Sequence, residues 1–395
     1  MSNQDPALLA AIQAHKGGHL EEAAAGYRQI LQSDPNNPDA LNFLGMLCCQ
    51  GGDATAGEEL LRRAVEADPG NPHAWLNLGT ALMVRKNPQE ASAAFRKATE
   101  LAPNLPMAWY NLGVCLGRCK EPREAASSLH RALKLEPGHL PAYAALANAL
   151  HRLGEYTEAA EVYREWLKYE PNNHGARHLL AAVSQHAVPM RADERYVRQM
   201  FDDFADEFDE NLHNLGYRAP QWVAERLTGA VGASGGIEIL DAGCGTGLCA
   251  PLLRPLARRL VGVDLSPNMV EKARERGGYD ELVVGDLSQA MRERPGSFDA
   301  VVSADTLVYF GALEEPLAAA RACLRERGLI VFSVEQLAGS EPYRLEQHGR
   351  YSHSESYLRR VLEGAGFDEV SFEVRTLRRE RGADVAGYVT LARAR

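Results

Sequence analysis

The feature that most constrains this chain is a proline that returns every 34 residues through its first half. It occurs at Pro35, Pro69, Pro103, Pro137 and Pro171. A fixed period of this length indicates a repeat architecture, in which each unit is one supersecondary element and neighbouring units complete the core. Because proline cannot continue a helix, each of these positions predicts the end of a helical hairpin.

Other positions keep the same phase. Each aligned unit has a large residue, then Leu-Gly or its equivalent, then a small residue where two helices approach closely, and a bulky residue four positions later. The large residues are Leu41, Trp75, Trp109 and Tyr143, the small ones Ala91, Ala125 and Ala159, and the bulky ones Phe95, Leu129 and Tyr163. The pattern resembles the tetratricopeptide repeat over about residues 4–173. The stretch 172–186 is expected to be a solvating last helix, so the predicted all-α solenoid domain spans residues 1–187.

The resemblance implies a superhelix whose concave groove binds a protein or peptide. Asn77 and Asn111 occupy the same helix position in successive repeats. Their side-chain amides can pair with a ligand backbone without selecting its sequence. The alternative is that these asparagines are solvated or bridge two helices. Phe43 and Ala145 stand where a longer asparagine ladder would continue.

The period ends near a stretch with a proline and no apolar spacing, residues 184–196, which is predicted to be a linker. After it, five apolar residues recur at helical spacing: Phe201, Phe204, Phe208, Leu212 and Leu215. Such a stripe fits either a face buried in the core or a lid over a neighbouring site. Both interpretations stay open from the sequence.

From residue 237 onward, apolar strands alternate with helical segments. The strands are predicted at 237–243, 259–266, 281–288, 298–307 and 328–335, and the helices include 267–277 and 313–328. This alternation predicts a doubly wound parallel sheet, with its ligand beyond the carboxyl ends of the strands. A last helix at 354–367 and two strands, 368–380 and 384–395, close the chain.

The first of these strands runs into the glycine motif GxGxG at residues 243–247. A dinucleotide fingerprint would need glycine where Leu248 stands. Asp264 follows Gly243 by 21 residues at a strand end, where a carboxylate can accept from two ribose hydroxyls. Asp286 ends the next strand, where it can meet an adenine amino group. Glycines let the backbone approach a ligand closely.

Three stretches, LDAGCGTG, VGVDLSPNMVEKA and VVGDLS, resemble in order the motifs of class I S-adenosylmethionine-dependent methyltransferases. The likeness covers about residues 195–395, within a second domain predicted at 188–395, and implies a Rossmann-like sheet with an antiparallel last strand. Two further stretches, 201–220 and 349–354, resemble a group of predicted repeat-plus-methyltransferase proteins. The resemblance implies S-adenosylmethionine as cofactor, bound by Asp241, Gly243, Cys244, Gly245, Gly247, Asp264, Leu265, Met269, Asp286, Leu287, Ala304 and Tyr217.

No sequence motif identifies a catalytic residue. Asp305 and Tyr309 follow the fourth strand, where the methyl group would lie, and Tyr351 and His353 precede the last helix, where the family often builds its acceptor pocket. The asparagine-proline-proline-tyrosine motif of amide and adenine methylation is absent from "SADTLVYF". Oxygen, carbon, carboxylate and amine acceptors remain open.

Three functions therefore stay in view. The first is methylation of a protein, peptide or carrier-bound group recruited by the repeats. The second is methylation of a small molecule, with the repeats serving assembly. The third is an inactive adaptor that senses the donor.

Composition limits the partners and the cellular location that this chain is expected to have. The chain holds 43 basic and 53 acidic residues, for a net charge of −10. Neither half is basic, which argues against broad nucleic-acid binding. Seven cysteines, an odd number, show no metal-ligand spacing, so no metal is expected. With neither a signal-peptide pattern nor a membrane-length apolar run, the sequence predicts a reduced cytoplasmic protein.

Overall fold

The computed structural model describes residues 6–232, 235–380 and 382–395. Its contacts divide the chain into two compact units, Met1–Pro171 and Asn172–Arg395. Residues 1–5, where the predicted repeat domain starts, lie outside the described residues. The predicted boundary after residue 187 comes later than this division, because helix α11 (His174–Ser184) makes its contacts within the second unit.

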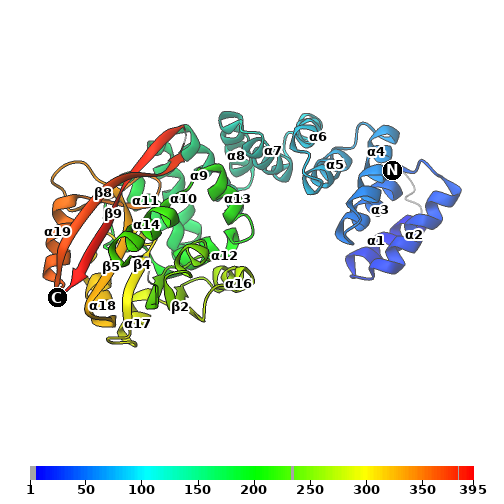
Figure 1. Ribbon diagram of the computed structural model, residues 1–395. Coiled ribbons are helices and arrows are strands. Elements are labelled where there is room, and N and C mark those ends of the chain that lie inside the picture. Colours follow the sequence, from blue (N-terminus) through cyan, green and yellow to red (C-terminus); the bar gives the residue numbers. More distant parts are fainter. Residues whose placement is uncertain (1–5, 233–234, 381) are drawn as a thin grey trace. The chain divides into compact units, whose positions relative to one another are not determined.

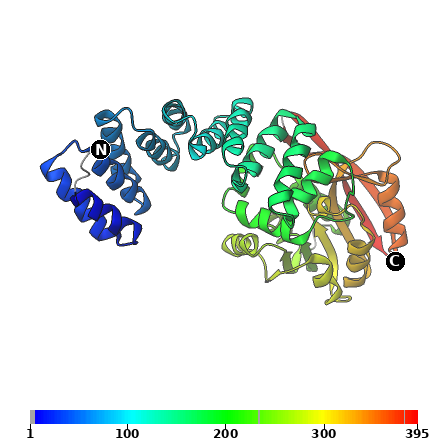
Figure 2. The same cartoon turned by 180° about the vertical axis from the view of Figure 1, so that it is seen from behind.

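The first unit consists of consecutive antiparallel helical hairpins, drawn from blue through cyan to blue-green in Figures 1 and 2. The helices are α1 (Pro6–Lys16), α2 (Leu20–Ser33), α3 (Pro38–Gln50), α4 (Ala54–Ala67), α5 (Pro72–Val84), α6 (Pro88–Leu101), α7 (Pro106–Arg118), α8 (Pro122–Leu135), α9 (Leu140–Leu153) and α10 (Tyr156–Tyr169). Each proline of the 34-residue period comes two residues after an even-numbered helix ends. The predicted hairpins are therefore confirmed, with the period prolines at their ends.

The structure explains why the large residue and the period proline recur together. The side chain of the large residue donates a hydrogen bond to the carbonyl oxygen of the proline six positions earlier. The donor–acceptor distance is 2.9 Å in Trp75 to Pro69, Trp109 to Pro103 and Tyr143 to Pro137. The bond ties the first helix of each of these repeats to the turn that precedes it.

The glycine and the bulky residue of a repeat also form one packing unit. A Cβ atom added to Gly79 would lie 2.5 Å from the Phe95 ring, and one added to Gly113 would lie 2.5 Å from Leu129. Phe95 and Leu129 are buried where their helices cross these glycines. A larger residue at either glycine would therefore overpack the crossing.

The two asparagines predicted to face the groove, Asn77 and Asn111, differ in their surroundings. The Asn77 side-chain nitrogen donates to Oδ1 of Asn42 at 2.9 Å and contacts the sulfur of Met46. Asn42 is buried, so this pair bridges two helices and realises the alternative role for Asn77. The Asn111 side chain is partly exposed and makes no hydrogen bond to another described residue. Asn111 is therefore the one of the two whose amide group is uncommitted.

The second unit is built on a single twisted sheet. Its strands are β1 (Ile237–Ala242), β2 (Ala257–Asp264), β3 (Glu281–Val284), β4 (Phe298–Ser303), β5 (Leu324–Gln336), β6 (Tyr343–Leu345), β7 (Tyr351–His353), β8 (Phe367–Glu380) and β9 (Ala383–Ala394). The order β3-β2-β1-β4-β5 is parallel, and β9 joins β5 antiparallel with β8 beyond it. The predicted fold class, a helical repeat followed by a doubly wound sheet with an antiparallel last strand, is confirmed.

Helices cover both faces of this sheet, because neighbouring strand residues point to opposite sides. Leu240 packs with α17, α18 and α19 on one face, and Ile239 packs with α14 and α15 on the other. The remaining helical segments of the unit are α12 (Glu194–Phe204), α13 (Phe208–Asn214), α14 (Ala219–Val231), α15 (Ala250–Leu253), α16 (Pro267–Arg276), α17 (Leu287–Arg292), the short turn η1 (Leu307–Tyr309), α18 (Glu314–Cys323) and α19 (Glu355–Gly364).

One predicted boundary is wrong. The helix expected at 313–328 ends at Cys323, and β5 begins directly at Leu324. Leu324 pairs with Phe298 before the register shifts, so backbone pairing with β4 draws these residues into the sheet. The three-residue strands β6 and β7 were not predicted, because so few residues carry no measurable period.

The stretch predicted as a linker is bound to the second unit. Arg191 forms an isolated antiparallel bridge with Phe310, and the Ala192 amide donates to the Tyr309 carbonyl at 2.9 Å. Further back, Nε2 of His178 in α11 lies 2.8 Å from the Gly349 carbonyl. No helix among the described residues combines the length and the apolar character needed to cross a membrane.

Candidate active site

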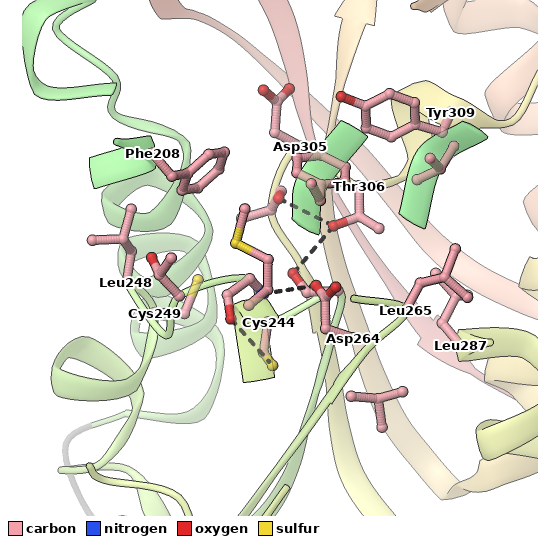
Figure 3. Close-up of a pocket in the computed structure, with 18 of the residues that line it drawn as sticks. Phe208, Cys244, Leu248, Cys249, Asp264, Leu265, Leu287, Asp305, Thr306 and Tyr309 are labelled. Atoms are coloured by element: carbon pink, nitrogen blue, oxygen red, sulfur yellow. Dashed lines mark hydrogen bonds between the residues drawn. The ribbon is translucent and has the colours of Figure 1, made fainter. Parts of the chain in front are cut away.

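The candidate site is a cavity at the carboxyl ends of β1 to β4, as expected for this sheet. Figure 3 shows residues from the four following loops around it. The loops contribute Gly243, Cys244, Gly245, Thr246, Leu248, Cys249, Asp264, Leu265, Met269, Gly285, Asp286, Leu287, Ala304, Asp305, Thr306 and Tyr309. Ten of the twelve residues predicted to bind the cofactor line this cavity, including Tyr217 from the segment before β1.

The glycine turn after β1 has the backbone that its sequence predicts. Gly243, Gly245 and Gly247 have φ angles of 86°, 53° and 84°, in the left-handed region that other residues rarely adopt. A Cβ atom on Gly243 would lie 2.1 Å from the hydroxyl oxygen of Thr306. The turn therefore brings its backbone against the loop that follows β4, and a side chain at Gly243 would separate the two.

Asp264 joins the glycine turn to the end of β2. One carboxylate oxygen accepts from the Gly245 amide at 2.8 Å, and the other accepts from the Ser266 amide at 2.9 Å. Burial raises the pKa of Asp264, while these backbone hydrogen bonds act in the opposite direction. Each carboxylate oxygen has a further lone pair, so Asp264 can still accept from a vicinal diol.

The neighbouring wall is apolar, with one engaged carboxylate. Leu265 and Leu287 lie together on one side of the cavity in Figure 3. Asp286 caps α17 by accepting from the Gln289 amide at 2.9 Å, and its second oxygen pairs with Arg191 at 2.5 Å. The predicted linker thus supplies a cation to the acidic residue expected at the adenine.

Two predicted cofactor ligands support the turn from behind instead of lining the cavity. Asp241 is fully buried; one of its oxygens accepts from the Tyr279 hydroxyl at 2.6 Å, and the other has no partner among the described residues. Burial raises the pKa of Asp241 to about 7, against the opposing effect of the Tyr279 hydrogen bond. Gly247 packs against Tyr279 and α16. Neither Asp241 nor Gly247 lines the cavity, so each would act on a bound cofactor through the turn that it supports.

The apolar stripe before the sheet lies over the cavity. Phe201, Phe208, Leu212 and Leu215 line it, whereas Phe204 is 38% exposed and touches Phe208 edge-on. The sequence left open whether the stripe faces the core or forms a lid. Four of its five residues line the cavity, as expected of a lid. Alpha-helical spacing alone could not show which surface the stripe covers.

Polar contacts hold this lid to the glycine turn and to α16. The carboxylate of Asp202 accepts from the Ser266 hydroxyl at 2.5 Å, and that of Asp209 accepts from the Thr246 hydroxyl at 2.6 Å. Lys272 pairs with Asp206 at 2.9 Å. The lid is therefore fastened to the same loops that would hold the donor.

The lining of the cavity also includes two arginines that the sequence did not single out, Arg350 and Arg378. Arg378 is 1% exposed and pairs with Asp305 at 3.0 Å. Arg350 belongs to the GRYxHS stretch, so a signal existed for it. Arg378 sits in "RTLRRE" on β8, where nothing in the sequence distinguishes it from its arginine neighbours.

The structure does not bring Tyr351 and His353 into the cavity, which corrects their prediction as acceptor contacts. Both are fully buried in the layer behind it. The Tyr351 hydroxyl donates to the Pro189 carbonyl at 2.7 Å, and Nε2 of His353 lies 2.9 Å from the Phe310 carbonyl. The short β7 turns these side chains toward the loop after β4, where they support the wall from behind.

Because burial lowers the pKa of His353 to about 4 from an ordinary 6.5, we expect this residue to make the second unit acid-sensitive. Between these two pKa values, His353 is protonated in the unfolded chain and neutral in the folded chain. The free energy of unfolding should therefore fall as the pH drops from 6.5 to 4. The loss is on the order of 3 kcal/mol. Urea unfolding of residues 172–395, followed by Trp222 fluorescence, measures it.

His353→Gln is the matched variant, since its side-chain amide can still donate to the Phe310 carbonyl. The difference between the native chain and this variant removes the opposite contribution of Asp241, whose raised pKa favours the folded state as pH falls. A difference that stays constant from pH 7 to 4 would contradict the assignment.

The residues present fit a donor with a diol, an apolar ring system and a compact polar end. The glycine turn would admit a ligand at its backbone, Asp264 offers acceptors, and Leu265 and Leu287 offer apolar walls. Burial raises the pKa of the Cys244 and Cys249 thiols well above the ordinary value, so neither is a nucleophile at neutral pH. Within the described ranges, no group of three or more His, Cys, Asp or Glu side chains is arranged to hold a metal.

Comparison with protein families agrees with the two-part structure. Residues 240–332 match the model of a Methyltransferase domain. Residues 8–72, 50–106 and 76–117 match one Tetratricopeptide repeat model, and residues 120–183 match another. The second repeat model extends through α11, which the contacts assign to the second unit.

Several curated methyltransferases are similar to part of this chain. Methyltransferase-like protein 27 of Homo sapiens is 39% identical over 120 residues, which are 30% of this chain and 48% of the relative. Malonyl-[acyl-carrier protein] O-methyltransferase of Serratia marcescens is 32% identical over 111 residues, 28% of this chain and 43% of the relative. Ubiquinone biosynthesis O-methyltransferase of Xanthomonas campestris is 33% identical over 123 residues, 30% and 48%. The chain spans about half the length of these relatives.

Two solved structures align with part of this chain. The crystal structure of MamA aligns with a TM-score of 0.39 at 25% identity, covering 41% of this chain and 94% of that one. YrrB, described as a TPR protein with an unusual peptide-binding site, aligns with a TM-score of 0.40 at 23% identity, covering 44% and 89%.

Proposed function

Because this chain carries tetratricopeptide repeats followed by a methyltransferase domain, we propose that it is an S-adenosylmethionine-dependent enzyme. In this proposal the repeats recruit a protein, peptide or carrier-bound acceptor. The single observation that carries the choice of donor is the hydrogen bond from Gly245 to Asp264 at 2.8 Å, which joins the glycine turn and the acidic strand end into one concave surface.

The donor would bring a methyl group on an already activated sulfonium. The chain's own residues then have three tasks. Asp264 would accept from the ribose hydroxyls, and Leu265 and Leu287 would enclose the adenine. The glycine turn would hold the methionine part, and the lid would exclude water. Holding two reactants in line in this way can lower the barrier by about 7–11 kcal/mol.

Recruitment through the repeats rests on the groove. Asn111 has an uncommitted amide, and the Asn77 amide nitrogen is held by Asn42 while its carbonyl oxygen has no hydrogen-bond partner among the described residues. A peptide backbone could therefore bond to Asn111 through donor and acceptor alike, and to Asn77 through the carbonyl.

Two other functions remain as alternatives. A small-molecule acceptor, with the repeats used for assembly, is favoured by one relative named for ubiquinone biosynthesis. Another relative, named for the acyl-carrier protein, supports the carrier-bound acceptor of the main proposal and is not a separate alternative. An inactive adaptor that senses the donor is disfavoured by the open cavity beside Asp305. Location in the cytoplasm remains a prediction from the sequence, which has no signal-peptide pattern and no membrane-length apolar run.

The division of labour predicts different behaviour for the full chain and for residues 172–395. Both should bind S-adenosylmethionine with the same affinity, because the cavity lies within the second unit. With tritiated methyl donor and a cell extract as acceptor, the full chain should label a protein fraction that the fragment labels at least tenfold less. Scintillation counting and calorimetry measure the two quantities. The fragment starts at 172 because α11 packs on the second unit.

Asn111→Ala in the full chain is the finer variant. The variant loses one or two hydrogen bonds of about 0.5–1.5 kcal/mol each. The KM for the labelled fraction should therefore rise about tenfold, while the donor affinity stays unchanged. Thr80→Ala, on the same repeat array, is the control. Equal labelling by fragment and full chain would instead support the small-molecule alternative.

A further inference from the structure

The lining of the cavity includes a network of ion pairs outside the residues proposed to hold the donor. Arg378 is its centre, with 1% of its surface exposed. Its guanidinium pairs with Asp305 at 3.0 Å, with Glu380 at 2.7 Å and with Glu335. Arg350 pairs with Glu335 at 2.9 Å and with Glu380. Three carboxylates thus face two guanidinium groups.

The charges of this network are fixed by mutual pairing. Burial disfavours the cation of Arg378, but Asp305, Glu335 and Glu380 outweigh that effect and raise its pKa. Burial likewise disfavours the anion of Glu335, but His348, Arg350 and Arg378 hold its pKa well below the ordinary range. The pairing therefore favours the charged forms of Arg378 and Glu335.

Asp305 is the member of the network that stands beside the donor loops. It follows β4 with a φ of 58°, an unusual conformation that aspartate tolerates better than most residues. Its amide donates to the Ser333 hydroxyl at 2.9 Å. The next residue, Thr306, donates to the Gly243 carbonyl at 3.2 Å. Asp305 is thus held from both sides next to the glycine turn.

Two phenol groups complete this part of the cavity. Figure 3 shows the Asp305 carboxylate and the Tyr309 hydroxyl on the same side of the cavity, above the glycine turn. Tyr217 lines the cavity close enough to Asp305 to feel its charge. Burial raises the pKa of both phenols, so both remain hydrogen-bond donors at neutral pH. Neither hydroxyl is bonded to any other residue in the described part of the chain.

We propose that Asp305, positioned by Arg378, accepts the proton of the acceptor, and that the methylated group is a neutral hydroxyl or amine, not a carboxylate. The acceptor's oxygen or nitrogen forms a bond to the methyl carbon as the carbon–sulfur bond breaks. The electron pair of that bond goes to sulfur, and the acceptor's proton passes to the Asp305 carboxylate, which later releases it to water. This inference rests on the proposed function.

Charge decides between these acceptor classes. A carboxylate acceptor arrives without a proton, needs no base, and would be repelled by the Asp305 carboxylate that lines the cavity. The nitrogens of Arg378 that could attract it are already paired with Asp305, Glu335 and Glu380. A neutral hydroxyl can instead donate to Asp305 and accept from a tyrosine hydroxyl with one lone pair, which leaves the other for the methyl carbon. A neutral amine can donate to Asp305 and keeps its single lone pair for the methyl carbon.

The first test needs no acceptor. S-Adenosylhomocysteine and sinefungin share the nucleoside, but sinefungin carries an ammonium group where the methyl would lie. In calorimetry with the full chain, Asp305→Asn should weaken sinefungin about tenfold and leave S-adenosylhomocysteine within twofold. Asp299→Asn, at the opposite end of β4 and paired with Arg325, is the matched control and should change neither affinity.

Arg378→Lys tests positioning. Lysine keeps the positive charge but cannot make the forked pairing of arginine. The affinity for sinefungin relative to that for S-adenosylhomocysteine should therefore fall several-fold, while the S-adenosylhomocysteine affinity stays unchanged. An unchanged sinefungin affinity in Asp305→Asn would overturn the proposal. Failure of the native chain to bind either nucleoside would instead overturn the proposed function.

The second test addresses the acceptor class. The full chain is incubated with tritiated methyl donor and cell extract, and the labelled products are treated with mild base. Methyl ethers and methylamines survive, whereas methyl esters release volatile methanol. Base-stable label that is lost in Asp305→Asn and kept in Asp299→Asn is the expected result. Volatile label would show a carboxylate acceptor and overturn the inference.

Discussion

Asp264→Ala should reduce S-adenosylmethionine affinity at least a hundredfold, measured by calorimetry on the full chain. The carboxylate is expected to bind two ribose hydroxyls, and hydrogen bonds to a charged group contribute about 1.5–3 kcal/mol each. The variant also removes the acceptor for the Gly245 amide, so the turn loses its tie to β2. Both effects act in the same direction.

Two comparisons separate ligand binding from damage to the turn. Asp264→Asn keeps an oxygen for the Gly245 amide and should bind the donor with intermediate affinity. Asp280→Ala is the control, because Asp280 accepts from the Leu260 amide at 2.7 Å near the other end of the same strand. Equal loss in Asp280→Ala, or tighter binding of NAD than of S-adenosylmethionine by the native chain, would sink the donor assignment.

Arg378→Met should destabilise the second unit by about 3–5 kcal/mol, because it leaves buried carboxylates without their cation. Glu335 would keep Arg350 and His348, whereas Asp305 would keep no cation. Urea unfolding of residues 172–395, followed by Trp222 fluorescence, gives the free energy. Sinefungin binding by the residual folded variant should also weaken, since Asp305 would lose its orientation.

Arg327→Met is the matched control for this loss. Arg327 is 59% exposed and pairs with Glu369 at 2.9 Å. An exposed pair of this kind contributes about 0–1 kcal/mol. If both variants lose the same stability, the network is an ordinary surface feature and its role in orienting Asp305 fails with it.

The position of the cavity and most of its lining could be predicted from the sequence, because short sequence motifs form them. Gly243, Gly245 and Gly247 require left-handed backbone within one turn, and a strand that ends in Asp264 must deliver its carboxylate to the sheet edge. Each of these constraints acts over a few residues. The lid could be predicted only in part. The sequence shows the helical spacing of Phe201 and Phe208 but not the surface that they cover.

The sequence by itself determined the repeat and the order of the strands, since a 34-residue period and the alternation of strand with helix are properties of the chain read in one direction. Only the tertiary structure decided that Arg378 meets Asp305 across 73 positions of sequence, that Tyr351 and His353 point away from the cavity, and that α11 packs on the second unit. The physical reason is that pairing of distant strands and burial of charge depend on the whole sheet. Within "RTLRRE", one arginine is buried because its strand lies beside β9 and faces the cavity, and no local property of that arginine distinguishes it from the others.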